Sequence, residues 1–495
     1  MPRNLIAGVL IPFLLLPISS CGPGNPSVLK AMEPVVVGQG VVNAAEYDPD
    51  RPGPHRLVVL NTSGTPHEWN ENLPPEWIPS SVDKTELVVV INPEREVDLG
   101  SQTYVNQAGQ RVEVHRIRYE MDVDVREART GNVLWTYTLR GTDPGRFPYE
   151  LRGNVGLRGE PVTPTALETL LKCRIQQDKC KVLRSEDIID FALAPDGTII
   201  ALGLRDGTIQ LRTIDEGILL HTLEGHQQAV NSLAFSPDGT LLASGDIRGD
   251  TGAVTVRLWR TSDGKLVRSE ELYSAYFVNS LTFSPDGLFL AVISAGGLDN
   301  VLLWDISDGE TIYARCISVM GVATATYLPD GTLLTFESYQ KDSSDYSHIA
   351  LWSVSNDSCT LLRDEEVWQG YSSISLSPDG MLLAMGSYSG GILIKRLQNW
   401  ENAYSLSAPP PFTFDRSPVN SLDFSSDGSF LVSGLNVYAQ IWRLNTQGYL
   451  IEEASQTLEF PGNVVKVAFS PQGSSLILLV EDGTLWIWDV GVTRP

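Results

Sequence analysis

The chain of 495 residues contains few of the residue types from which catalytic and metal sites are usually built. It has six histidines, and no two of them stand at a metal-ligand spacing such as HxxxH or HxH. It also lacks a GxSxG nucleophile elbow, a GxxxxGK(S/T) phosphate loop and a cysteine with an evident histidine partner. We therefore expect no metal, no cofactor and no catalytic residue, and the sequence predicts a protein that is not an enzyme.

Basic residues are scarce as well, with 36 Lys and Arg against 60 Asp and Glu and a formal net charge of −24. A surface of this sign repels phosphate backbones, so we expect no nucleic-acid partner. The charge also favours solubility. An apolar fraction of 42% and a charged fraction of 19% are typical of a folded globular protein, and the length accommodates two folded units and a targeting segment.

The apolar run Leu5–Ile18 follows the basic Arg3 and is too short to span a bilayer comfortably as a helix. It ends in Ile18-Ser19-Ser20-Cys21, which resembles the bacterial lipobox. The resemblance implies that residues 1–20 are a lipoprotein signal peptide and that Cys21 receives the lipid. The protein would then be extracytoplasmic, anchored to a bacterial membrane at the cell surface or facing the periplasm. The alternative is an ordinary signal peptide whose cysteine is incidental.

One stretch, VNSLAFSPDGTLLASG at Val230–Gly245, returns along the chain to its C-terminal end. Copies of its turn lie around Asp196, Asp238, Asp286, Asp330, Asp379, Asp427 and Gln472. They are roughly 42 to 49 residues apart, a period typical of propellers built from four-stranded units. Within a copy, alternating residues predict a strand and Pro-Asp-Gly predicts a tight turn to the next one. Each unit is an antiparallel sheet that needs its neighbours to bury both faces.

The repeats resemble the WD-repeat family. LEGH at Leu223–His226 is similar to the family's Gly-His, and LLWD at Leu302–Asp305 and WIWD at Trp486–Asp489 are similar to its Trp-Asp ending. The resemblance implies an all-β fold with a seven-bladed WD-type β-propeller over residues 180–490. It also implies a structural hydrogen-bonded set in the second unit, made of His226, Ser244, Asp250 and Trp259.

The number of strands predicts how the ring closes. The first repeat begins at an innermost strand, Asp187–Pro195, whereas the last repeat stops after its third strand at Val490. One outer strand is missing at the end, and the spare segment Lys181–Ser185 precedes the first repeat. We predict that this segment completes the last sheet, beside the strand of Trp488, which removes an open sheet edge.

The part before the repeats has a different character. Residues 21–55, rich in Gly, Pro, Asp and Asn, predict a tether. Residues 56–160 predict an additional N-terminal β-rich, sandwich-like domain, because Ile117–Val125 alternates apolar and polar residues and Arg129–Gly131 turns the chain towards a partner strand, Val133–Leu139.

A connector, residues 161–179, joins this domain to the repeats. Its capping-box spacing at Thr165–Glu168 predicts a short helix to about Ile175. Cys173 and Cys180 follow it and could pair in an oxidising compartment, with free thiols as the alternative. Cys316 and Cys359 fall in neighbouring repeats at positions too far apart for a bond.

Aromatic residues gather in the loops that join second to third strands and one repeat to the next. In a WD-type propeller these loops open on one face, where large aromatic rings act as protein-binding hot spots. The candidate binding residues are Tyr273, Tyr276, Phe277, Trp368, Tyr371, Tyr388 and Tyr438, with Tyr339 and Tyr346 in the fourth repeat. The alternative is that many of these rings pack between the sheets.

Together these features predict a membrane-anchored, non-catalytic protein–protein interaction scaffold whose partners bind the loop face. Two alternatives stay open. One is a scaffold for envelope assembly, and the other is a hydrolase or carbohydrate-active enzyme that uses the central channel.

Overall fold

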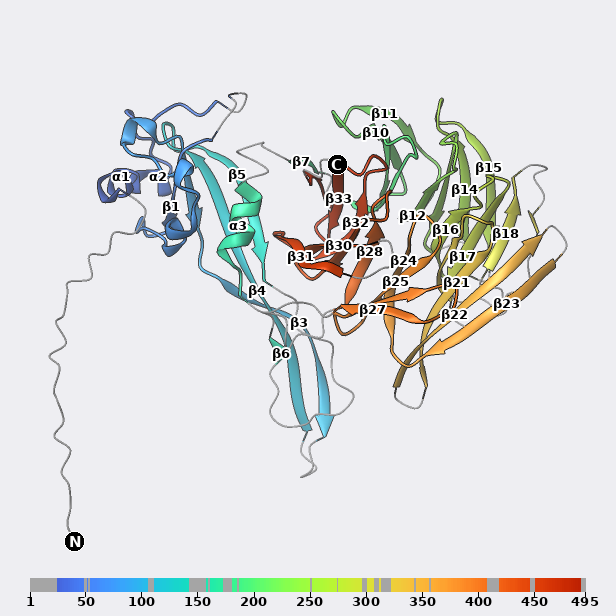
Figure 1. Ribbon diagram of the computed structural model, residues 1–495. Coiled ribbons are helices and arrows are strands. Elements are labelled where there is room, and N and C mark those ends of the chain that lie inside the picture. Colours follow the sequence, from blue (N-terminus) through green and yellow to red (C-terminus); the bar gives the residue numbers. More distant parts are fainter. Residues whose placement is uncertain are drawn as a thin grey trace, which may run out of the picture. The chain divides into compact units, whose positions relative to one another are not determined.

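The computed structural model describes most of the chain (Figure 1), in residues 25–48, 51, 54–105, 111–141, 157–158, 161–171, 180–184, 187–249, 252–273, 275–295, 301–306, 311–312, 322–341, 344–355, 358–406, 418–445 and 450–490. The chain divides into two units. Met1–Asn92 and Val123–Thr136 form the first, and Pro93–Asp122 and Tyr137–Pro495 form the second. In the described residues, no helix is long and apolar enough to cross a membrane.

The first unit is built on one small sheet with strand order β1-β2-β4. Strand β1 (Leu57–Asn61) runs parallel to β2 (Leu87–Ile91), and β2 pairs antiparallel with the last part of β4 (Arg111–Glu127). The short helices of this unit are α1 (Pro26–Ala31), α2 (Glu33–Val36), η1 (Glu68–Asn72), η2 (Pro75–Trp77) and η3 (Val82–Lys84). The described strands form a single sheet, so the expected sandwich is not what the structure has.

The expected tether is wrong for residues 25–48, which are packed into the first unit. Asn25 caps α1 by accepting a hydrogen bond from the backbone N–H of Ser27. The following apolar side chains stand at helical spacing, so they share one face and are buried against β1, β2 and the turn after β4. This core comprises Val28, Leu29, Met32, Val35, Ala44, Val58, Leu60, Val88, Val90 and Ala128. The Gly- and Pro-rich composition of the segment concealed this short amphipathic pattern.

The predicted hairpin of residues 117–139 is confirmed, because β4 pairs with β5 (Val133–Arg140). Gly131 adopts a φ of 75° in the turn, and its N–H bonds the carbonyl of Glu127. The predicted 56–160 domain is nevertheless divided between the two units. The first part of β4 belongs to the second unit, where it pairs with β3 (Arg95–Val105) and with β6 (Leu157–Arg158).

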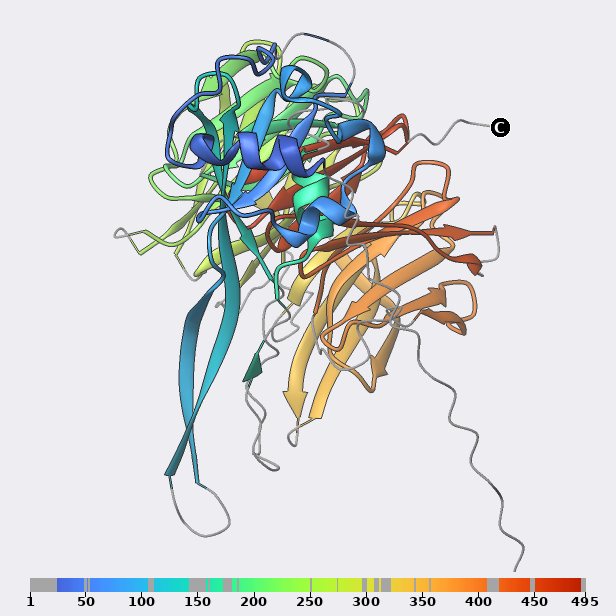
Figure 2. The same cartoon turned by 90° about the vertical axis from the view of Figure 1, so that its left-hand side faces the viewer.

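The repeats form seven four-stranded sheets, all in the second unit (Figures 1 and 2). In ring order, the first three are β8 (Ile188–Leu193), β9 (Ile199–Leu204), β10 (Ile209–Thr213), β11 (Leu219–Leu223); β12 (Val230–Phe235), β13 (Leu241–Asp246), β14 (Val254–Arg260), β15 (Leu266–Leu272); and β16 (Phe277–Phe283), β17 (Phe289–Ala295), β18 (Val301–Asp305), β19 (Thr311–Ile312). The next three are β20 (Val322–Tyr327), β21 (Leu333–Lys341), β22 (Ser344–Ser355), β23 (Ser358–Val367); β24 (Tyr371–Leu376), β25 (Leu382–Ser387), β26 (Ile392–Arg396), β27 (Asn402–Leu406); and β28 (Val419–Phe424), β29 (Phe430–Leu435), β30 (Tyr438–Leu444), β31 (Leu450–Glu459).

The seventh sheet confirms the predicted closing strand. It consists of β32 (Val464–Phe469), β33 (Ser475–Val480), β34 (Thr484–Asp489) and, from the opposite end of the repeat region, β7 (Cys180–Arg184). Strands β34 and β7 are antiparallel, with Trp488 opposite Cys180 and Trp486 opposite Val182. The outer edge of the last repeat is therefore paired by a strand that precedes the first one.

The Pro-Asp-Gly turns behave as predicted. In the second sheet the Asp238 carboxylate accepts bonds from Ser236 Oγ at 2.6 Å and from the Thr240 N–H at 3.0 Å. The Ser236 bond is the main cause of the lowered pKa of Asp238. The glycine after each turn residue has a φ between 68° and 85°, which non-glycine residues rarely adopt. These glycines are Gly197, Gly239, Gly287, Gly331, Gly380, Gly428 and Gly473.

Neighbouring sheets bury one another's faces. One core joins the first and second sheets, and another joins the first and seventh sheets across the closure, so both faces of the first sheet are covered. The closure core comprises Ile188, Phe191, Ile200, Leu202, Leu204, Ile214, Ile477, Leu479, Leu485 and Ile487.

A polar side chain also occupies one position of every innermost strand, directly after the bulge that each of these strands contains. In five sheets it is a hydroxyl, and these residues are Ser232, Ser280, Thr324, Ser373 and Ser421. In the first and seventh sheets the equivalent residues are Asp190 and Lys466. Their ion pair, at 2.6 Å, lies at the joint where the ring closes.

The Asp190–Lys466 pair is bound to the backbone as well. Lys466 Nζ donates to the Phe191 carbonyl at 2.7 Å, and Asp190 accepts the Leu233 N–H of the second sheet at 2.9 Å. Burial raises the pKa of Asp190 in spite of the neighbouring ammonium group. The pair therefore links three consecutive sheets of the ring.

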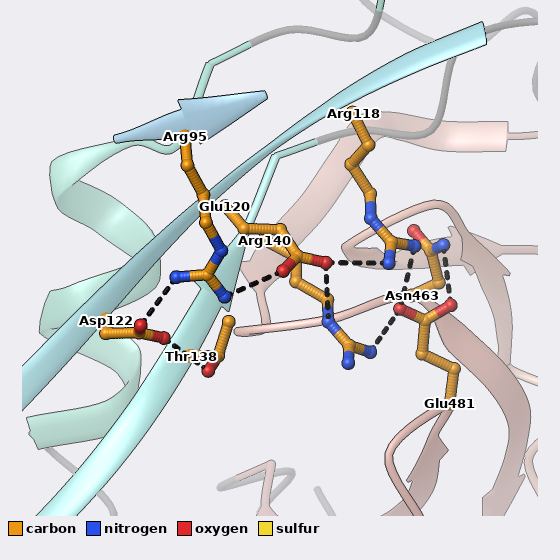
Figure 3. A network of polar contacts seen from close by, with 8 residues as sticks. All are labelled: Arg95, Arg118, Glu120, Asp122, Thr138, Arg140, Asn463 and Glu481. Carbon is orange, nitrogen blue, oxygen red and sulfur yellow. Dashed lines mark hydrogen bonds and ion pairs between the residues drawn. The ribbon is translucent and has the colours of Figure 1, made fainter. Parts of the chain in front are cut away.

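A network of charges joins the hairpin of β3, β4 and β5 to the seventh sheet (Figure 3). Glu120 accepts from Arg95 at 2.9 Å and from Arg118 at 2.8 Å. Arg118 and Arg140 both donate to Glu481, which follows β33, at 3.1 and 2.5 Å. Because three arginines alternate with Glu120, Asp122 and Glu481, the half-buried charges balance.

Two further contacts complete this attachment. Asn463, before β32, donates to Oε2 of Glu481 at 3.0 Å, whereas the two arginines donate to Oε1 of the same carboxylate. The backbone N–H of Arg140 donates to the Pro461 carbonyl at 3.0 Å. On the hairpin, Asp122 accepts from Thr138 and Arg95, and these bonds outweigh burial and lower its pKa. The hairpin is thus fixed to the connection into the last sheet.

The connector helix α3 (Pro164–Leu171) begins earlier than predicted. Thr163 Oγ1 accepts from the Ala166 N–H at 3.4 Å and donates to Glu459 of β31. The capping residue is therefore Thr163 and not Thr165. Leu167, Leu170 and Leu171 are buried, as their spacing predicted. Burial raises the pKa of Glu459, which ends β31 beside this cap.

We expect that Lys466→Met destabilises the ring by about 2–3 kcal/mol at pH 7. This is less than the roughly 3–5 kcal/mol for breaking a fully buried pair, because Lys466 is about one-third exposed (35%). Without the ammonium group the buried Asp190 takes up a proton, so its folded-state pKa rises further above the unfolded value. The stability linked to that proton is present at pH 4 and is lost as the pH rises towards 7. Urea unfolding at both pH values measures the deficit.

The double variant Asp190→Asn/Lys466→Met is the control for this prediction. It removes both charges but keeps an acceptor for the Leu233 N–H, so most of the stability should return at pH 7. Equal destabilisation of the single and double variants at both pH values would contradict the proposed role of the pair.

Candidate functional site

The loops expected to bind partners lie along one edge of each sheet. In the second sheet, Val230 at the start of the first strand pairs with Asp246 at the end of the second, and Val254 at the start of the third pairs with Leu272 at the end of the fourth. The turn between second and third strands and the connection to the next sheet therefore lie together. We call this the loop edge, and the Pro-Asp-Gly turns lie at the opposite edge.

A chain of four buried side chains lies beneath the loop edge of the second sheet. Trp259 Nε1 donates to Ser244 Oγ at 2.8 Å, and Ser244 Oγ lies 2.7 Å from His226 Nε2. The other ring nitrogen, Nδ1, lies 2.9 Å from the carboxylate of Asp246. Asp246 also accepts the Thr255 N–H of β14, at 2.5 Å.

The structure brings His226, Ser244 and Trp259 together as predicted, but the carboxylate is that of Asp246. Asp250, proposed from the sequence, lies outside the described residues. The loop after β13 is longer than usual for this repeat, so the sequence spacing pointed to an aspartate four residues after Asp246. Asp246 itself ends β13, directly opposite the start of β12.

The set contains a serine, a histidine and an aspartate in hydrogen-bond contact, which is also the composition of a hydrolase triad. Its burial favours a structural role, because the Ser244 side chain is 0% exposed and its Oγ is already bonded to Trp259. Burial is the main cause of the lowered pKa of His226, against the opposing effect of Asp246. A neutral imidazole can donate to Asp246 and accept from Ser244, which holds the loop before β12 onto the sheet.

In two other sheets the described residues show the tryptophan bond with no histidine bonded to the hydroxyl. Trp352 Nε1 donates to Thr335 Oγ1 at 3.0 Å, and Trp442 Nε1 donates to Ser433 Oγ at 3.1 Å. The indole–hydroxyl bond between third and second strands is thus the more widespread element of the repeat.

An exposed aromatic cluster lies between the second and third sheets. Tyr273, Tyr276 and Phe277 are 67%, 55% and 41% exposed. The guanidinium of Arg248 lies 5.2 Å from the Tyr276 ring centroid, and its backbone N–H bonds the Tyr276 carbonyl at 2.7 Å. Ile247, also exposed, forms a β-bridge with Phe277. The sequence pointed to the aromatic residues and missed Ile247 and Arg248, which lie in the long loop after β13.

A second aromatic cluster lies on the fourth sheet, whose strands β21 and β22 are longer than their counterparts. Tyr339 and Tyr346 face each other across the hairpin with stacked rings 5.9 Å apart. Trp368, which is 81% exposed, meets Tyr346 edge to face at 5.4 Å. A Cβ at Gly370 would lie 2.8 Å from the Tyr388 ring, so Tyr388 also reaches this neighbourhood.

Not every predicted binding residue is available to a partner. Tyr371 is only 3% exposed and packs into the core between the fourth and fifth sheets, so its assignment to the binding surface is wrong. Tyr371 is the first residue of β24, and its ring points into the core, where burial raises the pKa of its hydroxyl to about 12. Tyr388 and Tyr438 are half-buried.

Cys21 and Cys173 lie outside the described residues, and Cys180 is placed only as part of β7. In the described residues no group of three or more His, Cys, Asp or Glu side chains could hold a metal ion.

Comparison with known proteins finds the WD domain, G-beta repeat, at residues 217–254, 264–305 and 409–436. An uncharacterized WD repeat-containing protein of Synechocystis sp. is 34% identical over 80 residues, which is 16% of this chain and 22% of that protein. Pre-mRNA-processing factor 19 of Oryza sativa subsp. japonica is 25% identical over 299 residues, covering 60% of this chain and 51% of the factor. The chain thus spans about half or less of these curated relatives.

Among solved structures, the Cps50 (Swd1) β-propeller domain of Myceliophteria thermophila is similar, with a TM-score of 0.52, 20% identity, and coverage of 63% of this chain and 98% of that domain. The WD40 repeats of RRP9 match with a TM-score of 0.51 at 17% identity, covering 63% of this chain and 97% of theirs. At this identity the likeness shows the fold. The matches support a WD-type β-propeller, and proteins of this kind are typically scaffolds for protein interactions.

The assignment of Asp246 can be tested by two isosteric variants. Asp246→Asn weakens the bonds to His226 and to the Thr255 N–H, so we expect a loss of about 1–2 kcal/mol in unfolding free energy. Asp250→Asn should change it by no more than about 0.5 kcal/mol, because Asp246 already supplies the carboxylate that bonds His226. Urea unfolding followed by tryptophan fluorescence measures both, and the reverse order of effects would restore Asp250 to the set.

Proposed function

We propose that this chain is a seven-bladed WD-type β-propeller with an additional N-terminal β-rich unit, acting as a non-catalytic scaffold that binds protein partners at its loop edge. The WD repeats and the propeller neighbours support the fold, and the typical role of such proteins supports the scaffold function. For this chain in particular, the scaffold function is supported by the side chains exposed on its loop edge.

The observation that carries the proposal is the exposure of large aromatic rings on the loop edge. Tryptophan and tyrosine are enriched among residues that dominate binding energy, since they bury a large area with few rotatable bonds. A tryptophan 81% exposed to water, next to two stacked tyrosines, gains this energy only when something covers it.

The carboxylates of the innermost strands have a different use. Asp190 is paired with Lys466 and accepts the Leu233 N–H, while Asp423 accepts the Phe469 N–H of the seventh sheet at 2.8 Å. Burial raises the pKa of Asp423 to about 7. Both groups hold the next sheet in register, which supports a structural role in place of the channel hydrolysis considered from the sequence.

Membrane anchoring through Cys21 is part of the proposal and is supported by the lipobox-like residues Ile18–Cys21. The protein would then be displayed outside the cytoplasm, where the acidic propeller presents its loop edge to other envelope or surface proteins.

The scaffold function predicts that alanine at Tyr276 or Trp368 weakens partner capture at least tenfold. Removal of a hot-spot ring costs about 2 kcal/mol or more, and roughly 1.4 kcal/mol corresponds to a factor of ten. The measurement is quantitative pull-down from detergent-solubilised membranes of the producing cell, with captured proteins identified by mass spectrometry.

The matched controls are Leu288→Ala and Met381→Ala, which remove exposed apolar side chains at the opposite edge, directly after Pro-Asp-Gly turns. They should leave capture unchanged. If all four variants capture the same proteins equally well, the loop edge is not the binding surface.

The anchor predicts that Cys21→Ala abolishes incorporation of radiolabelled palmitate and moves the protein from the membrane to the soluble fraction. Several acyl chains bind a membrane stably, whereas a protein without acyl chains has no lipid anchor. Cys316→Ala is the control and should keep both label and location. Unchanged labelling of Cys21→Ala would show that the cysteine is incidental.

A further inference from the structure

One face of the fourth sheet gathers aromatic and acidic side chains from three successive strands. Alternate residues of a strand point to the same face, and the registers place the members side by side. We call this set the aromatic–acidic face, and its members are Glu337 and Tyr339 of β21, Tyr346 and His348 of β22, Asp364 and Glu366 of β23, and Trp368 directly after β23.

Contacts within the face tie its members together. Tyr339 donates its hydroxyl to Glu366 at 2.6 Å, and this bond raises the pKa of Tyr339 to about 12. His348 lies 3.2 Å from Glu337 on one side and 3.2 Å from Asp364 on the other. The face therefore carries three carboxylates and one imidazole beside three rings.

One carboxylate oxygen of the face is left without a bond. The Glu337 side chain is 9% exposed, and its Oε1 contacts His348, but its buried Oε2 has no hydrogen-bond partner in the described residues. A buried carboxylate oxygen costs free energy unless a donor reaches it. The face thus has an acceptor available for an incoming N–H group.

On the opposite face of β23, an aromatic ring and a carboxylate are each paired with a cation from this protein itself. There Arg363 lies 4.8 Å from the Trp400 ring centroid, and Glu365 binds Lys395 at 2.7 Å. Elsewhere Arg268 lies 4.9 Å from the Trp304 ring centroid. Trp368 meets the Tyr346 ring edge to face, and its side chain is largely exposed to water.

We propose that the aromatic–acidic face binds an arginine-bearing segment of a protein partner, with a guanidinium group stacked on Trp368 and donating to the neighbouring carboxylates. The inference rests on the proposed scaffold function and names the chemistry of its partner. A guanidinium is planar, stacks on aromatic rings and carries five donors, which matches rings and carboxylates on one surface. The net charge of −24 attracts such a segment over distance.

The test uses the full chain and a fluorescein-labelled, end-blocked peptide of alternating glycine and arginine with three arginines. Binding is followed by fluorescence anisotropy at 50 and 300 mM NaCl. We expect saturable binding that weakens with salt, and at least tenfold weaker binding by Trp368→Ala. The double variant Asp364→Asn/Glu366→Gln should weaken binding about threefold to tenfold.

Controls separate the face from the general acidity of the protein. Asp215→Asn/Glu216→Gln removes the same number of charges from an exposed turn at the opposite edge, and it should bind like the unchanged protein. A peptide with citrulline in place of arginine keeps the shape without the charge and should not bind.

Three results would overturn the inference: equal binding of the citrulline peptide, unchanged affinity of Trp368→Ala, or displacement of the arginine peptide by a neutral oligosaccharide such as maltoheptaose. If these occur while Tyr276→Ala still loses captured proteins, the scaffold function stands and only the partner chemistry is wrong. If capture survives every loop-edge variant while the arginine peptide binds at Trp368, the face does bind arginine, but the loop edge is not the surface that captures protein partners.

Discussion

The arrangement of the repeats depends on one long-range event, the pairing of β7 with β34 and of Asp190 with Lys466, residues that are 276 positions apart in the chain. A four-stranded sheet with two apolar faces is stable only between neighbours, so an open row of seven would leave two such faces in water. Closing the row covers both, and it also pairs the last free strand edge. The cost is the entropy of joining distant segments, which grows slowly with the length of the loop between them.

The charged residues are placed where this closure needs them. Five inner strands use hydroxyl groups at the position that meets the next sheet, whereas the joint between last and first sheets uses an ammonium and a carboxylate. An ion pair discriminates against other partners, because a wrong pairing would bury an unpaired charge. The network of Arg95, Arg118, Arg140, Glu120 and Glu481 fixes the preceding hairpin to the same sheet. The sheets are built from similar repeats, so hydroxyl groups alone would not distinguish the closing joint from the others. The opposite charges of Asp190 and Lys466 mark that joint.

A closed ring then provides a rigid base for the loops. The buried set of His226, Ser244, Asp246 and Trp259 holds a loop through side chains that are unavailable for chemistry, while rings such as Trp368 extend from the same edge into water. The long strands of the fourth sheet, drawn in yellow and orange in Figure 2, carry one such aromatic cluster. Rigid positioning lowers the entropy lost when a partner binds, which suits a scaffold.

Local features of the sequence were sufficient where the physics is local. The repeated turn, Pro-Asp-Gly in five of its seven copies, is predictable because glycine adopts a positive φ without strain, and all seven turn glycines have one. Strand counting predicted the closing strand, because an unpaired edge has one remaining candidate. The tether failed for the opposite reason: the apolar side chains of residues 25–48 are buried only because β1 and β2, which come later in the chain, pack against them.

The sequence by itself determined the number and type of the repeats, their turns and the segment that completes the ring, since alternation, turn residues and edge pairing act over a few residues or follow from counting. Only the tertiary structure decided which side chains meet. It selected Asp246 over Asp250, buried Tyr371 while exposing Trp368, and brought Glu337, His348 and Asp364 to one face. These outcomes depend on register and on the path of each loop, which set side-chain positions to within a hydrogen-bond length that sequence spacing does not specify.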